Sequence, residues 1–586
     1  MKKTSQLKKL FEYLWKYRFM YLTGIAMLLI VDFCDLYIPQ LTGEVTDGLS
    51  SHVIGPEGIS RAVWKMVGYA ALIALGRLGF RYFIIGTSRK IERGLQNDIF
   101  AKLETLSQRY YNENKTGDLM SYFTNDLEAV REAIGWSVIS TFDAVVLTLM
   151  CLYRMMVNIN VRLTLYTLIP MVCIIFYGYF IFQKFESGYT MKQEAFAKLT
   201  DYVQESVSAE RVIKAFVQED KQLEEFKKVN KANMDVSMKV VRLRAYAWPV
   251  LEIFIGVAYV IAIVFGGYFC LTGEITLGKF VTFASYVGTL VWPMLAFGDC
   301  ITSLTLGVAG MKRINKAFEE IPDIQDDPNP DKIDRLTGHI VFDNVDFSYG
   351  KDMPDSLENI SVEIKAGETF AIMGRTGAGK TTMVNLMTRL YDTTDGHIYY
   401  DGHDIKKIPL KQLRESIAYV PQDNFMFSET LAKNISFGKQ DATMDEIIYY
   451  SQMADIDENI QEFPLKYETM VGERGVTLSG GQKQRASIAR ALLKDSDILI
   501  MDDSLSAVDT DTEDNILNNL KKIREGKTTI IIAHRVSTVA NADHILVLED
   551  GKMKEFGTFD ELIALDGEFA TMFKKQQLEK QLAAQQ

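Results

Sequence analysis

The sequence is poor in cysteine, with five residues in 586 and no Cys-x-x-Cys pair. All five lie within or at the edge of long apolar runs: Cys34, Cys151, Cys173, Cys270 and Cys300. No two of them have the spacing of a disulfide framework or a zinc site. This pattern excludes a disulfide-stabilised or zinc-organised scaffold.

Positive charge is also scarce relative to negative charge. The chain has 64 Lys and Arg against 76 Asp and Glu, a net charge of −12. Nucleic-acid binding needs a basic surface, so we expect no nucleic-acid partner. We also expect no cleavable secretory signal, because the first apolar run begins only near Phe19, is long, and lacks a following small-residue cleavage site.

The length predicts at least two domains, since 586 residues exceed one ordinary hydrophobic core. The mean hydropathy of zero conceals two unlike halves. Up to about Thr302, long apolar runs alternate with charged stretches. After Gly307, short apolar strands, glycine-rich turns and amphipathic helices indicate a soluble α/β domain.

Six segments of the first half are long and apolar enough to cross a bilayer, which takes about 20 residues in a helix. They are 17–40, 61–86, 133–157, 161–182, 248–271 and 277–302. Very short links join the third segment to the fourth and the fifth to the sixth. The stretches after the second and fourth segments are long, charged and helical in pattern, so we expect helices that continue from the bilayer into the cytosol.

Basic residues predict the orientation of these segments. They precede the first segment and follow the second, at Lys2, Lys3, Lys8, Lys9, Lys16, Arg18, Arg89, Lys90 and Arg93. The loop 41–60 has acidic residues and no Lys or Arg. Since basic residues stay inside, we expect a cytosolic N-terminus, and six crossings return the soluble half to the cytosol.

Residues 5–18 place Leu7, Leu10, Phe11 and Leu14 on one helical face. This pattern favours an interfacial helix on the inner leaflet. An ordinary surface helix is the alternative.

Charged residues within the predicted spans are costly in lipid and often mark pathways. Asp32 and Asp35 lie in the first segment, and Arg77 and Arg81 in the second. At about 1.5 Å per residue, Asp32 lies about 20 Å above its cytosolic entry, whereas Arg77 lies near the inner leaflet. Because these depths differ, we predict no direct ion pair between the aspartates and the arginines.

Asp143 lies near mid-depth in the third segment. Asp32 and Asp143 either line a wet cavity that favours cationic substrates or buttress the helices. The sixth segment carries aromatic residues that suit an amphipathic substrate and helix packing equally well. These are Phe280, Phe283, Tyr286, Trp292 and Phe297.

The strongest motif is "AIMGRTGAGKTT", in which Gly374-x-x-x-x-Gly379-Lys380-Thr381 follows an apolar strand and precedes a helical run. Such a loop lets backbone N–H groups and a helix N-terminus converge on phosphate oxygens. Lys380 is expected to reach the β- and γ-phosphates and Thr381 to bind Mg²⁺. ATP and Mg²⁺ are therefore the predicted ligands.

Two further motifs complete this prediction. Asp502 closes the buried strand "ILIMD" and supplies a second Mg²⁺ contact. In "LSGGQKQRASIARAL", Ser479 and two glycines open a second helix suited to a phosphate. One nucleotide uses both helix ends only if two surfaces come together, so we expect two domains to sandwich ATP.

With these motifs in order, the chain resembles an ATP-binding-cassette (ABC) exporter half-transporter, whose signature is "LSGGQ". Six spans followed by one nucleotide domain is the exporter arrangement, so the resemblance covers the whole chain. It implies an α-helical membrane domain with six transmembrane helices and long cytosolic extensions, plus an α/β P-loop ATPase domain with a helical signature subdomain. The implied boundaries are an elbow helix at 1–16, the membrane domain with two coupling loops at 17–305, a linker at 306–335, the nucleotide-binding domain at 336–575 and a tail at 576–586.

The resemblance also implies roles for individual residues. Tyr349 resembles the aromatic residue that stacks on adenine, Gln422 the glutamine that senses Mg²⁺ and water, and His534 the histidine at the γ-phosphate. The implied nucleotide contacts are Tyr349, Gly374, Arg375, Thr376, Gly377, Ala378, Gly379, Lys380, Thr381, Thr382, Ser479, Gly480, Gly481, Gln482 and Asp509. The implied metal ligands are Thr381, Gln422 and Asp502, and the implied catalytic residues are Asp503, His534 and Gln422.

Longer stretches also resemble family elements. Residues 468–475 resemble the exporter-specific loop and residues 506–509 the loop that crosses between two nucleotide sites. Residues 116–126 and 205–216 match the places of the coupling helices.

Asp503 departs from the family, which usually has a glutamate after the metal aspartate. A carboxylate one methylene shorter is retracted from the attacking water, and such a misplacement can cost about 100-fold in rate. We therefore predict the weakly hydrolytic subunit of a heterodimeric bacterial multidrug exporter. Its partner would be a second, non-identical half-transporter with glutamate at this position, and its other contacts would be membrane lipids and an amphipathic small molecule.

Other interpretations remain open. A homodimer whose aspartate works slowly, exporting lipids or peptides, fits the same motifs. An ATP-gated channel, a regulatory ABC protein and an importer of the same architecture are further alternatives. A soluble DNA-repair ATPase shares the signature, but six apolar spans exclude it.

Overall fold

The structure, a computed structural model, describes residues 7–350, 353–472 and 478–584. Residues 1–6 of the predicted elbow, 473–475 of the predicted exporter loop and 585–586 of the tail lie outside these ranges. The chain divides into a membrane unit, up to Glu104 and Asn114–Glu320, and a nucleotide unit, Thr105–Glu113 and from Ile321 onward. Each unit is described by itself.

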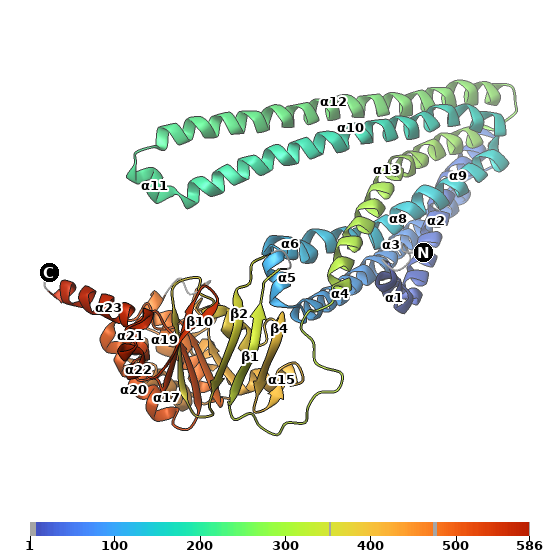
Figure 1. Ribbon diagram of the computed structural model, residues 1–586. Helices are drawn as coiled ribbons and strands as arrows, with labels where there is room; N and C mark the ends of the chain where they lie inside the picture. Colours follow the sequence, from blue (N-terminus) through green and yellow to red (C-terminus); the bar gives the residue numbers. More distant parts are fainter. Residues whose placement is uncertain (1–6, 351–352, 473–477, 585–586) are drawn as a thin grey trace. The chain divides into compact units, whose positions relative to one another are not determined.

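The membrane unit is entirely helical in its described residues (Figure 1). It contains α1 (Lys8–Lys16), α2 (Arg18–Ser50), α3 (Pro56–Phe80), η1 (Arg81–Ile85), α4 (Gly86–Glu104), α6 (Thr116–Ser121), η2 (Tyr122–Asp126), α7 (Leu127–Ile134), α8 (Trp136–Phe142), η3 (Asp143–Leu147), α9 (Thr148–Arg154), η4 (Met155–Ile159), α10 (Val161–Ser208), α11 (Glu210–Ala215), α12 (Glu219–Leu271) and α13 (Leu277–Glu319). The turns η1 to η4 are π-helical and continue the helices on either side of them.

The described residues include six helical stretches long and apolar enough to span a bilayer, which confirms the six predicted segments. Asn160 alone separates η4 from α10, and residues 272–276 separate α12 from α13, as the short links predicted. The long extensions are helical too. α12 has 53 residues, about 80 Å at 1.5 Å per residue, and so extends far beyond a bilayer core of about 30 Å.

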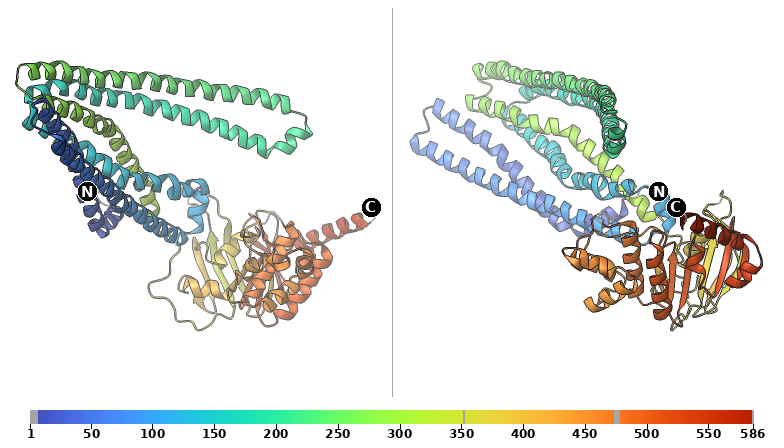
Figure 2. Two further views of the ribbon diagram at one scale, coloured as in Figure 1. Left: turned by 180° about the vertical axis from the view of Figure 1, so that it is seen from behind. Right: turned by 90° about the vertical axis from the view of Figure 1, so that its left-hand side faces the viewer.

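α10 and α12 form an antiparallel arm whose far end carries α11, and all views show the two helices side by side (Figure 2). In the figures this end of the arm extends past the other helices of the membrane unit. Three apolar side chains at this tip are exposed: Val212 at 58%, Phe216 at 71% and Val217 at 78%.

The prediction of no ion pair between the first two spans is wrong for Asp35. The Arg77 guanidinium donates to the Asp35 carboxylate at 3.1 Å. The predicted depths failed because α2 continues to Ser50 and α3 begins at Pro56, beyond the predicted ends at 40 and 61. Counted from this hairpin, the two residues differ by about six positions, roughly 9 Å along the axis, which a long arginine side chain spans.

Two further boundaries differ from the predictions. α13 continues to Glu319, past the predicted linker start at 306, because its buried residues recur at helical spacing as far as Ala317. The first predicted coupling stretch, 116–126, belongs to the membrane unit, where the Arg313 guanidinium pairs with Asp126. The segment that joins the nucleotide unit is Thr105–Glu113, just before it.

The nucleotide unit combines two sheets with helices. Its elements are α5 (Gln108–Glu113), β1 (Ile340–Phe347), β2 (Leu357–Ile364), β3 (Thr369–Gly374), α14 (Lys380–Met387), β4 (Asp395–Tyr400), β5 (His403–Asp404), α15 (Leu410–Ser416), β6 (Ile417–Val420), α16 (Leu431–Ser436), α17 (Met444–Met453), α18 (Asp457–Glu462), η5 (Lys466–Glu468), α19 (Gly480–Leu493), β7 (Ile498–Asp502), α20 (Thr510–Ile523), β8 (Thr528–Ile532), α21 (Val536–Val539), β9 (His544–Glu549), β10 (Lys552–Gly557), α22 (Phe559–Ala564) and α23 (Glu568–Ala584).

The larger sheet positions the candidate site. Its strand order is β10-β9-β3-β8-β7-β6, with β10 antiparallel and the other five parallel. β7 and β8 are buried along their whole length, as aliphatic strands covered on both faces should be. The smaller antiparallel sheet has the order β2-β1-β4-β5. The helices α16 to α19 form the predicted helical subdomain and share a hydrophobic core with β6 and β7.

Candidate nucleotide site

The candidate site lies at the carboxyl ends of three neighbouring strands. β8 pairs in parallel with β3 on one side and with β7 on the other, so their carboxyl ends meet at one edge of the sheet. β3 ends at Gly374, β7 at Asp502, and β8 leads into His534. Ligands of open parallel sheets bind at such an edge. The fold thereby brings together motifs that are far apart in the sequence.

The phosphate loop depends on two of its glycines. Gly374 has φ 150° and Gly379 has φ 98°, values that residues with a side chain rarely adopt. A Cβ on Gly374 would lie 2.3 Å from the Leu548 carbonyl oxygen, and one on Gly379 would lie 2.8 Å from that of Ser356. The loop is therefore packed too closely against β9 and the start of β2 for any larger residue.

Lys380, the first residue of α14, is buried at the centre of the loop. Its ammonium donates to the carbonyl oxygens of Gly374, at 2.8 Å, and Arg375, at 2.9 Å. Burial lowers the pKa of Lys380, and the nearby carboxylates of Asp503 and Asp502 oppose that shift. These bonds hold the cation inside a ring of backbone groups, where the phosphates of ATP would meet it.

Thr381 and Asp502 fit a magnesium ion. The Thr381 hydroxyl lies 3.3 Å from Oδ1 of Asp502, while Oδ2 of Asp502 is buried and has no hydrogen-bond partner in the described structure. Burial raises the pKa of Asp502. A hydroxyl and a carboxylate are hard oxygen donors of the kind that Mg²⁺ prefers beside substrate phosphates.

Asp503 directly follows Asp502, the predicted metal ligand, at the end of β7. Its backbone has φ 46°, and its N–H donates to the Ile532 carbonyl at 3.0 Å. The Gln422 amide is 3.5 Å from its carboxylate, which is a long contact. The two side chains predicted to act on water therefore lie close together but are not tightly joined.

A cleft of about 550 Å³ gathers most of the predicted residues. It is lined by Tyr349, Thr376, Gly377, Gly379, Lys380, Thr381, Thr382, Gln422, Asp502, Asp503 and His534, together with Pro354, Asp355, Ser356, Ile532, Asp550 and Gly551. The sequence reasoning did not find the last six. A usable signal for Asp550 was its position directly after β9, the strand beside β3.

Tyr349 lies at one end of this cleft. Its ring packs edge-on against Phe347 and Tyr391, and its hydroxyl lies 3.1 Å from that of Thr382. The ring is therefore held by an aromatic cluster next to the phosphate loop, which suits stacking on a planar base.

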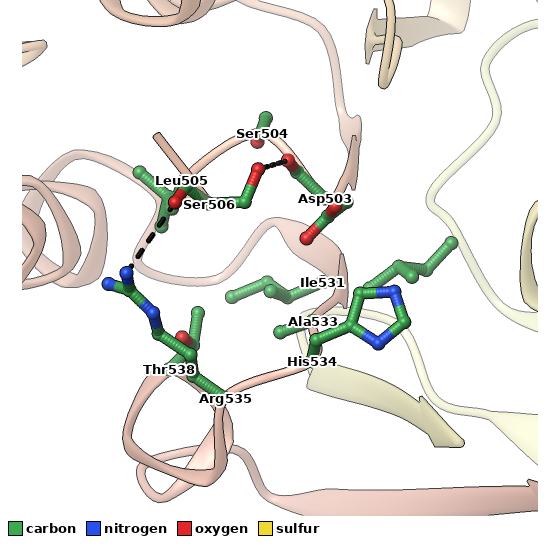
Figure 3. A pocket seen from close by; sticks show the side chains of 10 residues that line it. Asp503, Ser504, Leu505, Ser506, Ile531, Ala533, His534, Arg535 and Thr538 are labelled. Atoms are coloured by element: carbon green, nitrogen blue, oxygen red, sulfur yellow. Dashed lines mark hydrogen bonds between the residues drawn. The ribbon is translucent and has the colours of Figure 1, made fainter. Parts of the chain in front are cut away.

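His534 borders a second, smaller pocket of about 100 Å³ (Figure 3). Burial and the nearby Lys380 ammonium lower the pKa of His534. Asp503 and Ser506 lie across this pocket, where the Ser506 hydroxyl donates to the Asp503 carbonyl at 3.0 Å.

A buried clamp that the sequence reasoning missed lies beside this pocket. Glu513, on α20, is 1% exposed, accepts from the Arg535 guanidinium at 2.7 Å, and also accepts from the Thr538 hydroxyl. Arg535 also donates to the Val508 carbonyl at 3.3 Å. The clamp therefore joins the loop after β7 to the turn that carries His534.

The signature residues do not line the cleft of their own chain. Ser479 caps α19 by accepting from the Gln482 N–H at 3.2 Å, and the Gln482 side chain returns a bond to the Ser479 N–H. Asp509 caps α20 in the same way, and its bond from the Thr512 N–H lowers the pKa of Asp509. Arg375 is also turned outward, in an ion pair with Glu568. That two domains sandwich ATP between this cleft and a signature helix stays a prediction.

Known proteins share both the sequence and the arrangement. Residues 21–294 match the family described as "ABC transporter transmembrane region", and residues 357–506 match "ABC transporter". A probable multidrug resistance ABC transporter ATP-binding/permease protein, YheI of Bacillus subtilis, is 37% identical over 98% of this chain and 98% of its own. The chain belongs to the ABC transporter family.

Two further similarities support this assignment to the ABC transporters. The multidrug resistance-like ATP-binding protein MdlA of Escherichia coli is 35% identical over 99% of this chain and 98% of its own. The structure of a bacterial Atm1-family ABC exporter with ATP bound superimposes with a TM-score of 0.80 and 26% identity, covering 95% of this chain and 98% of the other. This ABC transporter is thus an ATP-hydrolysing, multi-pass membrane protein with the exporter fold.

In this ABC transporter, α5 packs within the nucleotide unit. Asn112 donates to the Tyr391 hydroxyl at 2.9 Å, and Ser107 donates to Asp323 at 3.2 Å. Tyr391 in turn packs against Tyr349. α5 is therefore connected through Tyr391 to the residue predicted to stack on adenine.

Proposed function

We propose that this chain is one subunit of a heterodimeric exporter that moves amphipathic compounds out of the cytosol or the inner leaflet. Its own site would hold ATP and hydrolyse it slowly, while its signature completes the catalytic site of a non-identical partner. The relatives whose names refer to multidrug resistance support the substrate class. A cytosolic N-terminus and nucleotide unit are part of the proposal.

The observation that carries the weak-site proposal is Asp503. A general base must come within hydrogen-bond reach of the water it activates. The carboxylate of Asp503 is one methylene shorter than the usual glutamate, and the Gln422 amide lies 3.5 Å from it, a long contact. The other parts needed to bind ATP line the same cleft, which supports retention of the nucleotide rather than rapid turnover.

The chain's own residues have distinct tasks in this proposal. Lys380 and the loop N–H groups would hold the β- and γ-phosphates, and Tyr349 would orient the base. Mg²⁺, held by Thr381 and Asp502, would supply charge neutralisation at the phosphates. His534 would hold the γ-phosphate from the β8 side. Closure of two nucleotide units around ATP would then draw the cytosolic ends of the membrane helices together.

The arm supports the requirement for a second subunit. Val212, Phe216 and Val217 are exposed at the arm tip, beyond the part of α10 and α12 that a bilayer would cover. Apolar side chains gathered in water mark an interaction surface. Another half-transporter is the partner that the exporter fold implies.

ATPase measurements on the purified chain test the proposal. Alone, the chain should bind ATP but hydrolyse it at least tenfold more slowly than the assembled transporter. Addition of a partner with glutamate at the position of Asp503 should restore turnover. Brisk hydrolysis by the chain alone, as a dimer of two identical copies, would contradict the heterodimer and favour the homodimeric exporter.

A further inference from the structure

Two carboxylates in the membrane unit are buried without a complete set of partners. Asp32, on α2, is 3% exposed, and its Oδ2 has no hydrogen-bond partner in the described structure. Asp143 begins the π-helical turn η3, and its Oδ1 is likewise buried and unpartnered. Ionisable groups at membrane depth are costly, so they persist where they serve a purpose.

The two carboxylates lie on neighbouring elements. α2 packs against η3, and Asp32 and Asp143 lie within electrostatic range of one another. The other charged groups in range are Asp35 and Arg77. Arg77 is already bound to Asp35 at 3.1 Å, so one cation serves three carboxylates.

The next arginine along these helices is also engaged. Arg154 donates to the Gln40 side chain at 2.8 Å, and its guanidinium lies 4.2 Å from the centre of the Tyr37 ring and 5.3 Å from that of Phe33. Among the described residues, Arg77 is thus the one cation near Asp32 and Asp143, and it forms no ion pair with either of them. A buried carboxylate in this position must be neutralised by a proton or by a bound positive charge.

We propose that Asp32 and Asp143 form a single cation-binding site, which holds a proton when it is empty and exchanges it for the positive group of an amphipathic substrate. The proton leaves a carboxylic acid O–H for water as the substrate cation enters, and no other bond changes. This proposal rests on the proposed export function, and it narrows the substrate class to amphipathic cations.

Proton release on binding is the direct test. Tetraphenylphosphonium, a permanent cation, is titrated calorimetrically into the assembled transporter in two buffers with different heats of ionisation. About one proton should be released for each cation bound. The D32N/D143N variant should release none, and so should D143N alone. Glu44→Gln, an exposed carboxylate on the same helix, is the matched control and should behave as the unmodified protein.

Binding without proton release in the unmodified transporter would overturn the proposal, because it would show that the carboxylates stay protonated and only buttress the helices. Equal proton release from D32N/D143N would overturn it as well, because the proton would then come from another site.

Transport into inside-out vesicles gives a second readout. The ratio of tetraphenylphosphonium uptake to uptake of neutral triphenylphosphine oxide should fall at least tenfold in D32N/D143N, and this ratio is independent of how much protein folds. An unchanged ratio would overturn the proposal. If the unmodified transporter accumulates neither compound, the proposed export function fails, whereas the calorimetry still decides whether the cation site exists.

Discussion

Asp503 combines a short side chain with a backbone conformation that few residues tolerate. At φ 46° it lies in the left-handed region, which costs most side chains roughly 1–2 kcal/mol and aspartate less. Aspartate suits this backbone conformation better than glutamate does, but its carboxylate reaches less far than that of glutamate. A change at this position should therefore alter stability and rate in opposite directions.

The D503E variant should hydrolyse ATP about tenfold to 100-fold faster than the unmodified chain, because the longer side chain brings the carboxylate to the water. The midpoint of its thermal unfolding should also be a few degrees lower, because the left-handed backbone conformation is less favourable for glutamate than for aspartate. Phosphate release and thermal unfolding measure the two effects. D503N, which keeps the length and loses the charge, is the control and should show no gain; a D503E rate equal to that of the unmodified chain would contradict the reach argument.

Residues of the phosphate loop were predictable because their chemistry imposes strict local sequence. Gly374 and Gly379 admit no Cβ, Lys380 must be buried among backbone carbonyls, and Asp502 must end a buried strand. The ion pair between Arg77 and Asp35 was not predictable in the same way. It depends on where a helical hairpin ends, and hydropathy alone does not fix that position.

At the scale of elements, the clamp of Glu513, Arg535 and Thr538 holds two loops of the site in register. It links α20 to the turn before α21, so it connects the segment after Asp503 with the segment of His534. Its parts come from two places in the chain, at least 22 positions apart, and show no periodic pattern. Only the pairing of β7 with β8 brings them together, which is why the sequence did not reveal them.

Arg535→Ala should lower both stability and turnover. The substitution leaves the Glu513 carboxylate buried with one remaining partner. The free energy of unfolding should fall by about 1–3 kcal/mol. This is the low end for a buried pair, because the Arg535 side chain is 43% exposed. The midpoint temperature of thermal unfolding should fall by roughly 2–8 °C. In the assembled transporter kcat should fall more than the affinity for ATP, with partial recovery in R535K.

Lys527→Ala provides the comparison, since it removes an ion pair with Asp495 on the surface of the same unit. That change should cost less than about 1 kcal/mol and leave kcat unaltered. Equal effects of the two substitutions would show that the clamp has no positioning role.

The helices themselves were largely predictable, because each apolar run has the length a bilayer requires. The helical parts beyond the apolar runs were less predictable. The division of the first extension at Thr105–Glu113 rests on contacts such as that between Asn112 and Tyr391, which join residues 279 positions apart. Local pattern carries no information about such a contact.

At the scale of the whole molecule, the arm α10–α11–α12 exposes apolar side chains at its tip. The exposed residues are Val212, Phe216 and Val217, which lie beyond the part of α10 and α12 that a bilayer would cover. Exposed apolar side chains of this kind are typical of an interaction surface, here for the proposed second subunit.

The F216D/V217D variant should fold and bind ATP as the unmodified chain does, but fail to assemble, because two desolvated apolar contacts become buried charges at the partner surface. Size-exclusion chromatography with light scattering checks the assembly, with at least a tenfold loss of the complex expected. Lys228→Glu, an exposed change on α12 away from the tip, is the control. Normal assembly of F216D/V217D would show that the tip is not part of the interface.

Hydrogen bonds join the signature helix α19 to the loop that follows β7. The Gln484 side chain, on the signature helix α19, donates to the Ser506 hydroxyl at 3.1 Å and accepts from the Ala507 N–H at 2.9 Å, while Ser506 donates to Asp503. If two such chains sandwich ATP as proposed, these bonds would connect the signature helix α19 to the loop that carries Asp503 in the same chain. In the proposed heterodimer, release of nucleotide at one site would then disturb the other site, so two sites with unequal rates would remain coupled.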